Sequence, residues 1–252
     1  MPERLDGTVA LVTGASSGIG RASALSLAAQ GASVAIVARR RDRLETLAAT
    51  IRSGRGRPLI LAADITNASE AAAVVEDTVA EFGRLDTVVN GAGVMLTGDS
   101  VDSPLENWER MIDLNLRALT YITKAALPHL LESVVTSSRS VSDVVNVSSV
   151  AGRVISPRTA IYNATKFAVT AATESWRQEY TRQGIRFSVI EPGAVGTELS
   201  LQQESTRVWL HTAFAGREIL HAQDIADAIA YIITNPRRVA VNEIVIRPTD
   251  QL

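Results

Sequence analysis

Residues 8–20 read TVALVTGASSGIG, a short apolar run followed at once by a turn rich in glycine and serine. The apolar run predicts a strand buried on both faces, and Ile19–Gln30 after it shows a helical pattern. Glycine permits a sharp turn from strand to helix, and N–H groups at a helix N-terminus can approach a pyrophosphate. The spacing Gly14-x3-Gly18-x-Gly20 therefore predicts a dinucleotide-binding turn. A P-loop is excluded because no Gly-Lys-Ser/Thr follows.

The alternation of strand and helix continues along the whole chain. After Thr8–Val12, six further runs are expected to form strands: Ser33–Ala38, Pro58–Ala63, Leu85–Asn90, Asp143–Val147, Ile185–Ile190 and Asn242–Ile246. Helices are expected between them: Arg41–Arg52, Ala68–Phe82, Pro104–Leu131, Ile161–Gln183 and Asp224–Thr234. Continuous apolar strands alternating with helices are typical of a parallel sheet covered on both faces. The sequence predicts an α/β chain, a single-domain Rossmann fold over residues 1–252 with a seven-stranded doubly wound parallel sheet.

The helix expected over residues 68–82 carries the clearest periodic pattern. Its apolar stripe consists of Ala68, Ala72, Val75, Val79 and Phe82. Asn67, followed three residues later by Glu70, is expected to form a capping box at the start of this helix.

Two segments interrupt the alternation. Glu132–Ser142 is rich in serine and is expected to be an exposed loop. Segment 194–216 follows the sixth strand with weak periodicity, and its length is more typical of a substrate-binding loop or lid than of a plain connection. Apolar side chains that could line a pocket there are Leu199, Leu201, Val208, Trp209, Leu210 and Phe214.

The composition excludes several classes of protein. The 252 residues carry a net charge of −2 and a pI near 6.0, so a nucleic acid or an anionic membrane is not expected as partner. The absence of cysteine excludes disulfides, thiolate metal sites and a cysteine nucleophile. No metal site is expected, because the three histidines do not show metal-ligand spacing with carboxylates. No apolar stretch is long enough for a membrane span or resembles a signal peptide, so a soluble, cytoplasmic protein is expected.

The end of the second strand predicts which dinucleotide binds. An acidic residue about 20 residues after the glycine turn commonly binds the adenosine ribose of NAD. Here Ala38 occupies that position and is followed by Arg39, Arg40 and Arg41. Guanidinium groups beside an uncharged residue suit a 2′-phosphate, so NADP (NADPH) is the expected cofactor. Asp64, at the end of the third strand, could accept a hydrogen bond from the adenine amino group or could simply begin a helix.

Tyr162 and Lys166 are candidate catalytic residues. They are four residues apart, which places both side chains on one face of a helix. A lysine ammonium near a phenol favours the phenolate, so Lys166 is expected to lower the pKa of Tyr162 from about 10 toward neutral pH. Ser149 ends the fifth strand at its carboxyl end and could supply a hydroxyl donor on the same side of the sheet.

Together these motifs resemble the short-chain dehydrogenase/reductase family over essentially the whole chain. They are Thr13-Gly-x3-Gly-Ile-Gly20, Asp64, Asn90-Gly-Ala-Gly93, Asn115, Ser149, Tyr162-x3-Lys166 and Pro192-Gly-Ala-Val-Gly-Thr197. Residues around Asn115, the motif Val-Ile-Glu-Pro-Gly and the ending Ile-Arg-Pro-Thr-Asp-Gln are similar to the clavulanic acid dehydrogenase and 3-hydroxy acid dehydrogenase subgroup. The resemblance implies an NADP-dependent oxidoreductase that reduces an aldehyde or ketone to an alcohol, or catalyses the reverse.

The resemblance also implies roles for individual residues. Tyr162 would be the proton donor or acceptor, Ser149 would polarise the carbonyl oxygen, and Lys166 would hold the nicotinamide ribose and tune Tyr162. Asn115 would hold a water in a proton relay. The remaining cofactor contacts would be Gly14, Ser16, Ser17, Gly18, Ile19, Gly20, Arg39, Arg40, Asp64, Ile65, Asn90, Ala92, Gly93, Pro192, Gly193, Val195 and Thr197. A homotetramer is expected, with the helix Ile161–Gln183, residues 104–131 and the C-terminal Arg247–Leu252 in its interfaces. Trp176 and Tyr180, which are four residues apart on this helix, could pack in the core, but the resemblance favours an interface for them.

The sequence departs from the family pattern at Gly91, where the family has a second asparagine that helps to tie the central strands. Two other functions fit the sequence less well. A regulatory cofactor-binding module would not need Ser149, Tyr162, Lys166 and Asn115 together. A sugar-nucleotide epimerase or dehydratase would normally have a longer substrate domain than the residues after Pro192 provide.

Overall fold

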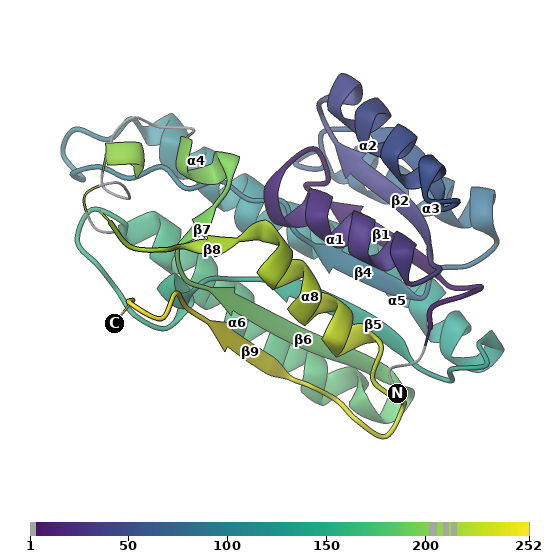
Figure 1. Ribbon diagram of the computed structural model, residues 1–252. Coiled ribbons are helices and arrows are strands. Elements are labelled where there is room, and N and C mark those ends of the chain that lie inside the picture. Colours follow the sequence, from purple (N-terminus) through teal and green to yellow (C-terminus); the bar gives the residue numbers. More distant parts are fainter. Residues whose placement is uncertain (1–3, 202–205, 209–211, 213–215, 252) are drawn as a thin grey trace.

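The computed structural model describes residues 4–201, 206–208, 212 and 216–251 and contains a central parallel sheet (Figure 1). Its strands are β1 (Val9–Thr13), β2 (Ser33–Ala38), β3 (Arg57–Ala62), β4 (Thr87–Asn90), β5 (Ser142–Val147), β6 (Ile185–Pro192) and β9 (Glu243–Ile246). They are ordered β3-β2-β1-β4-β5-β6-β9, and every pair is parallel. A separate two-stranded ribbon joins β7 (Val195–Gly196) to β8 (Leu220–His221). The predicted Rossmann fold is confirmed.

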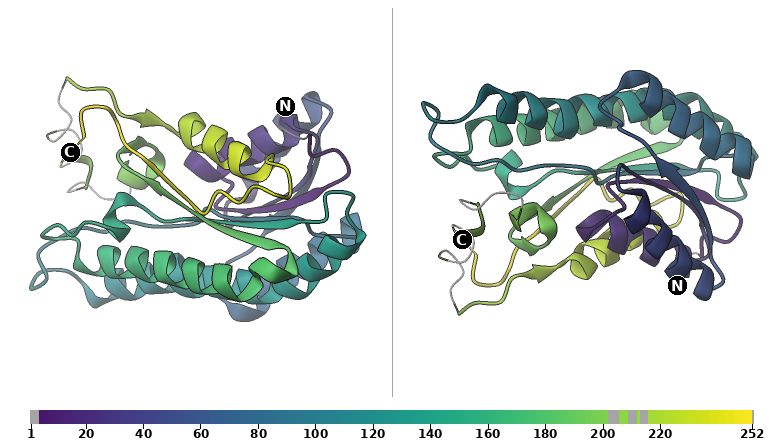
Figure 2. Two further views of the ribbon diagram at one scale, coloured as in Figure 1. Left: turned by 90° about the horizontal axis from the view of Figure 1, so that it is seen from below. Right: turned by 90° about the horizontal axis from the view of Figure 1, so that it is seen from above.

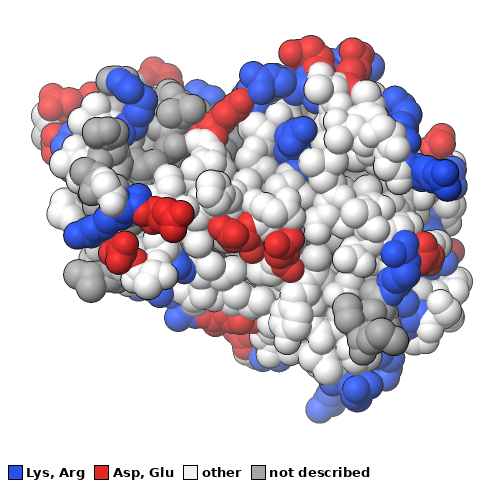
Figure 3. All heavy atoms as spheres, in the orientation of Figure 1, with Lys and Arg blue, Asp and Glu red and all other residues white. Residues whose placement is uncertain are grey.

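Helices cover both faces of the sheet (Figure 2). The cluster on one face involves α1 (Gly18–Ala29), α2 (Arg41–Ser53) and α8 (Ala222–Ile233). The other cluster involves α3 (Ala68–Phe82), α5 (Ala118–Thr136) and α6 (Ala160–Tyr180). No helix among the described residues has both the length and the apolar character that a membrane span requires. On the face shown in Figure 3, basic and acidic side chains are interspersed, with neither sign forming a broad field.

Alternation along the strands explains the two hydrophobic cores. In β1, Ala10 and Val12 belong to the cluster beneath α1 and α8, whereas Val9 and Leu11 belong to the cluster beneath α3 and α5. Because both sets are apolar, the strand is buried on both faces, and all five of its residues are buried.

Two details of α3 differ from the expectation. Its buried residues are Ala71, Val74, Val75 and Thr78. Of the predicted stripe, Val75, Val79 and Phe82 do face the core, whereas Ala68 and Ala72 are exposed, so the stripe is wrong in its first half. Asn67 does cap the helix, accepting a hydrogen bond from the backbone of Ser69. The carboxylate of Glu70 instead accepts a hydrogen bond from the backbone N–H of Asp64, so the two side chains do not form the reciprocal capping box.

The long helix expected over 104–131 is interrupted. It consists of α4 (Leu105–Ile112), a π-helical turn η1 (Asp113–Arg117) and α5, which continues to Thr136. The expected exposed loop at 132–142 is therefore wrong over its first half. Its serines are used in packing: Ser133 and Ser142 are buried, and the Ser142 hydroxyl donates to the carbonyl of Leu130.

The topology determines where a ligand can bind. β1 lies between β2 and β4, so successive strands are added on opposite sides of β1, and a crevice opens at the carboxyl ends of β1 and β4. The side chain of Thr13 accepts hydrogen bonds from the N–H groups of Gly91 and Ala92 across this junction. A Cβ on Gly91 would lie 2.9 Å from the Thr13 carbonyl oxygen, so the departure from the family pattern coincides with a close backbone contact.

Candidate active site

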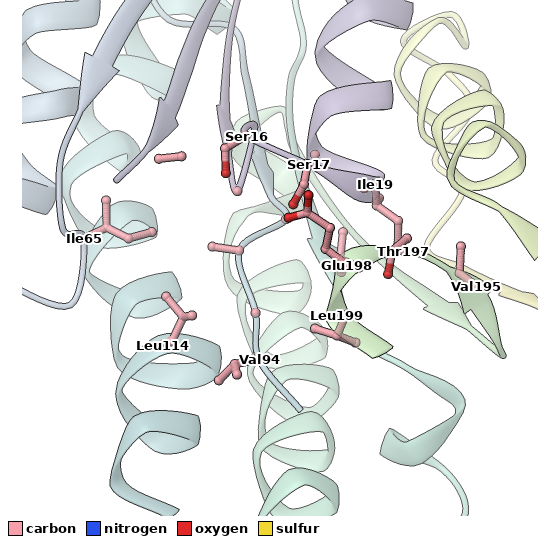
Figure 4. Close-up of a pocket in the computed structure, with 18 of the residues that line it drawn as sticks. Ser16, Ser17, Ile19, Ile65, Val94, Leu114, Val195, Thr197, Glu198 and Leu199 are labelled. Carbon is pink, nitrogen blue, oxygen red and sulfur yellow. The ribbon is translucent and has the colours of Figure 1, made fainter. Parts of the chain in front are cut away.

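A cavity of about 390 Å³ lies at the carboxyl ends of the central strands. Most of the residues predicted from the sequence line it: Gly14, Ser16, Ser17, Gly18, Ile19, Gly20, Arg39, Arg40, Asp64, Ile65, Ala92, Gly93, Ser149, Tyr162, Lys166, Pro192, Gly193, Val195 and Thr197. Figure 4 shows that these side chains come from both sides of the crevice, with Ser17 beside Glu198 and Ile19 above Thr197. Asn90 and Asn115 are the two predicted residues that do not line it.

The glycine turn brings backbone close to backbone at one end of the cavity. Gly14 has a φ of +70°, and a Cβ there would lie 2.8 Å from backbone atoms of Ala92. A Cβ on Gly20 would lie 2.5 Å from the Gly14 carbonyl oxygen. Both positions therefore require glycine, and the N-terminus of α1 faces the cavity with backbone N–H groups that can bind an anion.

Arg40 is the best-anchored cation at this end. Its Nη2 atom donates to the hydroxyls of Ser16 at 3.0 Å and Ser17 at 3.1 Å. The guanidinium of Arg39 is more exposed, at 61%, and lies 4.0 Å from the carboxylate of Asp64. Two guanidinium groups thus border the cavity beside two serine hydroxyls, a donor set suited to a phosphate.

Asp64 is itself part of a turn. Its Oδ1 atom accepts hydrogen bonds from the backbone N–H and the hydroxyl of Thr66. The other carboxylate oxygen, Oδ2, is the one nearest to Arg39. The side chain therefore acts locally as a helix-start residue and still lines the cavity.

Ser149, Tyr162 and Lys166 meet at the opposite end of the cavity. Lys166 Nζ donates to the carbonyl of Val147 at 2.9 Å and lies 5.8 Å from the centre of the Tyr162 ring. Ser149 hydrogen-bonds to the Tyr162 hydroxyl, and its Oγ accepts from the N–H of Ala151. All three side chains are at least nine-tenths buried. The end of β5 and one face of α6 thus bring a phenol, an amine and a hydroxyl together.

Burial dominates the pKa values of this cluster. It raises the pKa of Tyr162 to about 12, although the hydrogen bond from Ser149 acts in the opposite direction. It lowers the pKa of Lys166 to about 8, because the charged ammonium is removed from water. The expectation that the pKa of Tyr162 lies below 10 is wrong for this geometry, because burial of the phenol raises it. The Lys166 ammonium donates to the Val147 carbonyl.

Asn115 lies behind the cavity at the π-helical turn. Its Oδ1 atom accepts from the N–H of Val94 at 2.8 Å, and its Nδ2 atom donates to the Val94 carbonyl at 2.9 Å. Nδ2 also donates to the hydroxyl of Thr165, next to Lys166 in α6. The side chain is fully buried, and its hydrogen bonds join the segment after β4 to α6.

Asn90 connects two strands of the central sheet. Its Nδ2 atom donates to Asn146 at 2.8 Å, which ties β4 to β5, and also to Thr123 of α5. Asn146 in turn donates to Thr173 of α6 at 2.9 Å. These bonds hold the central strands and the two helices in register directly beneath the site.

Sequence reasoning missed several residues that line the cavity. They are Val94, Arg110, Leu114 and Glu198. Leu199, which was expected to line a pocket, does line the cavity. The only feature of the sequence that could have pointed to Glu198 is its position directly after Thr197, the last residue of the motif Pro192–Thr197. Val208 is exposed, and Trp209, Leu210 and Phe214 lie outside the described residues.

The donor set fits a nicotinamide dinucleotide. One end offers the N-terminus of α1, two serines and two guanidinium groups for phosphates. The other end offers the tyrosine, serine and lysine, and the walls between are apolar at Ile19, Ile65, Leu114 and Val195. Across the described ranges, no group of three or more histidine, aspartate or glutamate side chains is arranged to hold a metal ion.

Comparison with known proteins agrees with this geometry. The sequence profile of the short chain dehydrogenase family matches residues 8–207. A protein of Staphylococcus epidermidis named an uncharacterized oxidoreductase is 38% identical over 240 residues, covering 95% of this chain and 96% of that protein.

Solved structures are similar over nearly the whole chain. A serine dehydrogenase complexed with NADP⁺ has a TM-score of 0.87 at 28% identity, covering 97% of this chain and 96% of the other. A 3-ketoacyl-(acyl-carrier-protein) reductase from Brucella melitensis complexed with NADH has a TM-score of 0.86 at 29% identity, covering 98% and 100%. Both carry a nicotinamide cofactor. By its sequence, its fold and the residues gathered in its cavity, the chain belongs to the short-chain dehydrogenase/reductase family.

Proposed function

We propose that the protein is an NADP-dependent oxidoreductase that reduces an aldehyde or ketone to an alcohol, or catalyses the reverse. The observation that carries the proposal is the burial of Ser149, Tyr162 and Lys166 together at one end of a cavity whose other end carries Arg39 and Arg40. When bound, the cofactor would exchange a hydride with the carbonyl carbon. The remaining work of orientation, polarisation and proton transfer falls to the chain's own residues.

Each member of the cluster has a distinct task in this proposal. Tyr162 stays protonated at neutral pH, because its pKa is about 12, and so can donate a proton to the carbonyl oxygen during reduction. Ser149 donates a hydrogen bond to the same oxygen. Lys166 Nζ holds the nicotinamide ribose and contributes positive charge near the phenol. Through its hydrogen bonds to Val94 and Thr165, Asn115 positions the segment after β4 and the helix that carries Lys166. The proposed proton relay would begin at Asn115.

The preference for NADP rests on the phosphate end of the cavity. Ala38, which ends β2, provides no carboxylate to bind a ribose 2′-hydroxyl or repel a phosphate. Arg39 and Arg40 directly follow Ala38, and both line the cavity. Ser16, in the glycine turn, accepts a hydrogen bond from Arg40 through its hydroxyl. A 2′-phosphate there would accept charge-assisted hydrogen bonds that a ribose hydroxyl cannot match.

Arg39→Ala is expected to raise the KM for NADPH by about 10- to 150-fold, since a hydrogen bond to a charged group contributes about 1.5–3 kcal/mol. The KM for NADH should change little, and adding Ala38→Asp should move the preference toward NADH. Steady-state kinetics with both cofactors measures this. Arg41→Ala is the matched control, because Arg41 pairs with Glu45 on the outside of α2 and does not line the cavity.

A panel of aldehydes, ketones and hydroxy acids tests the reaction class. Oxidation of NADPH by at least one carbonyl compound is the expected result. No turnover with either cofactor across the panel would instead favour a cofactor-binding regulatory module. Equal losses for NADPH and NADH in Arg39→Ala would remove Arg39 from phosphate recognition while leaving the reaction class intact.

A homotetramer and a cytoplasmic location belong to the same proposal. Apolar side chains lie exposed on elements that could meet a second copy: Phe167 in α6, Tyr231 in α8 and Val245 in the edge strand β9. Light scattering at micromolar concentration is expected to give about four times the chain mass of 26.9 kDa. A mass equal to one chain would contradict the tetramer.

A further inference from the structure

Glu198 joins the two walls of the cofactor cavity. It begins η4 (Glu198–Leu201), directly after Thr197, and lines the cavity on the side opposite to α2. Its Oε2 atom lies 2.8 Å from Nη1 of Arg40, and its Oε1 atom accepts from Nη1 of Arg43 at 2.9 Å. In Figure 4 its carboxylate points at the hydroxyl of Ser17. One carboxylate thus bridges the guanidinium groups of Arg40, the residue that precedes α2, and Arg43 in its first turn.

The guanidinium of Arg40 is shared between this carboxylate and the phosphate end of the cavity. Its Nη2 atom faces Ser16 and Ser17, whereas its Nη1 atom faces Glu198. An anion bound beside Ser16 and Arg40 would therefore stand close to a carboxylate of the same sign. Arg40 and Arg43 also hold the pKa of Glu198 below its ordinary value, so the side chain is ionised at neutral pH.

We propose that Glu198 is an internal competitor for Arg40, so that a cofactor carrying a 2′-phosphate must displace or repel the Glu198 carboxylate as it binds. The inference rests on the proposed NADP specificity and adds a residue to it: Glu198 sets how strongly the 2′-phosphate is preferred. It acts through Arg40 and is a specificity-determining, positioning residue.

Calorimetric titration with two cofactor fragments, adenosine 2′,5′-bisphosphate and AMP, tests the proposal without turnover. Glu198→Gln keeps the size of the side chain and removes its charge. The Kd for the bisphosphate is expected to fall by about three- to tenfold at low ionic strength, while the Kd for AMP changes by less than about twofold. NADP⁺ and NAD⁺ should follow the same pattern.

Glu45→Gln is the matched control, because Glu45 also neutralises an arginine of α2, Arg41, but does not line the cavity. It should change neither Kd by more than about twofold. An unchanged or weaker affinity for the bisphosphate in Glu198→Gln, or an equal gain in Glu45→Gln, would overturn the competition.

The two proposals can fail separately. If the wild type does not prefer the bisphosphate but Glu198→Gln does, NADP specificity is wrong and the competition stands. If the wild type prefers the bisphosphate and Glu198→Gln leaves that preference unchanged, the competition is wrong and NADP specificity stands.

Discussion

Tyr162→Phe is expected to lower kcat by roughly 10²–10⁴, the contribution of a positioned general acid, while leaving the Kd for NADPH nearly unchanged. The substitution removes only a hydroxyl from a side chain that is 5% exposed, so the ring still fills its place against Val94 and Met111. Comparing cofactor binding by fluorescence with the steady-state rate separates the two effects. A near wild-type turnover would show that Tyr162 is not the acid.

The pH profile of the wild type provides a second readout of the same assignment. Tyr162 keeps its proton up to about pH 12, so it is not the first group of the cluster to titrate as the pH rises. Lys166, with a pKa of about 8, is charged below that value and loses its charge above it. In the reduction direction, kcat/KM should therefore be level below pH 8 and fall above it. A profile that is level to pH 10 would contradict a role for the Lys166 charge.

The fold could be predicted because its signals are local and repeated. The strand Ser33–Ala38 and the helix Ala68–Phe82 have the bounds expected from the sequence, because each apolar run ends at a turn or capping residue. The π-helical turn around Asn115 could not be predicted, since no local signal distinguishes it from the α-helix on either side. The exposed loop predicted over the serine-rich segment is wrong in its first half because serine, although typical of loops, is buried here at Ser133 and Ser142. The Ser142 hydroxyl is hydrogen-bonded to the carbonyl of Leu130.

The candidate site could be predicted in part for a related reason. Gly14, Ser149, Tyr162 and Lys166 belong to short motifs at the ends of strands or on one helix face, so their meeting follows from the topology. Glu198 could not be assigned, since its partners Arg40 and Arg43 are more than 150 residues away. The direction of the Tyr162 pKa was missed because the degree of burial depends on tertiary packing.

The surroundings of two aromatic residues in α6 could not be predicted from the sequence either. Trp176 and Tyr180 lie four residues apart in α6, and the family resemblance favoured an interface for them over the core. In the structure their rings lie 5.7 Å and 6.0 Å from the ring of Phe187 in β6, measured between centroids. Both side chains pack on the core beneath α6, so Phe167 is the better candidate on this helix for a contact with a second copy.

A buried ion pair holds the amino ends of β5 and β6. Asp143 accepts from Arg186 through both carboxylate oxygens, at 2.7 Å and 3.0 Å, and lies 3.5 Å from Nη1 of Arg139. All three side chains are nearly inaccessible to solvent. Arg186 also donates to backbone carbonyls that include Ile233, at the end of α8. One carboxylate therefore compensates two buried guanidinium groups and connects the serine-rich turn to the sheet.

Asp143→Asn is accordingly expected to lower the free energy of unfolding by about 3–5 kcal/mol, because it leaves the buried guanidinium of Arg186 without the carboxylate that it binds through two hydrogen bonds. Urea denaturation measures the loss. Glu174→Gln is the matched control: its partner Arg177 is also an arginine bound through both carboxylate oxygens, but the pair is exposed and should contribute less than about 1 kcal/mol. Since Asp143 lies at the amino end of β5 and the cavity lies beyond the other end of that strand, folded Asp143→Asn should keep its cofactor affinity. A loss no greater than that of Glu174→Gln would show that the buried pair does not stabilise the sheet.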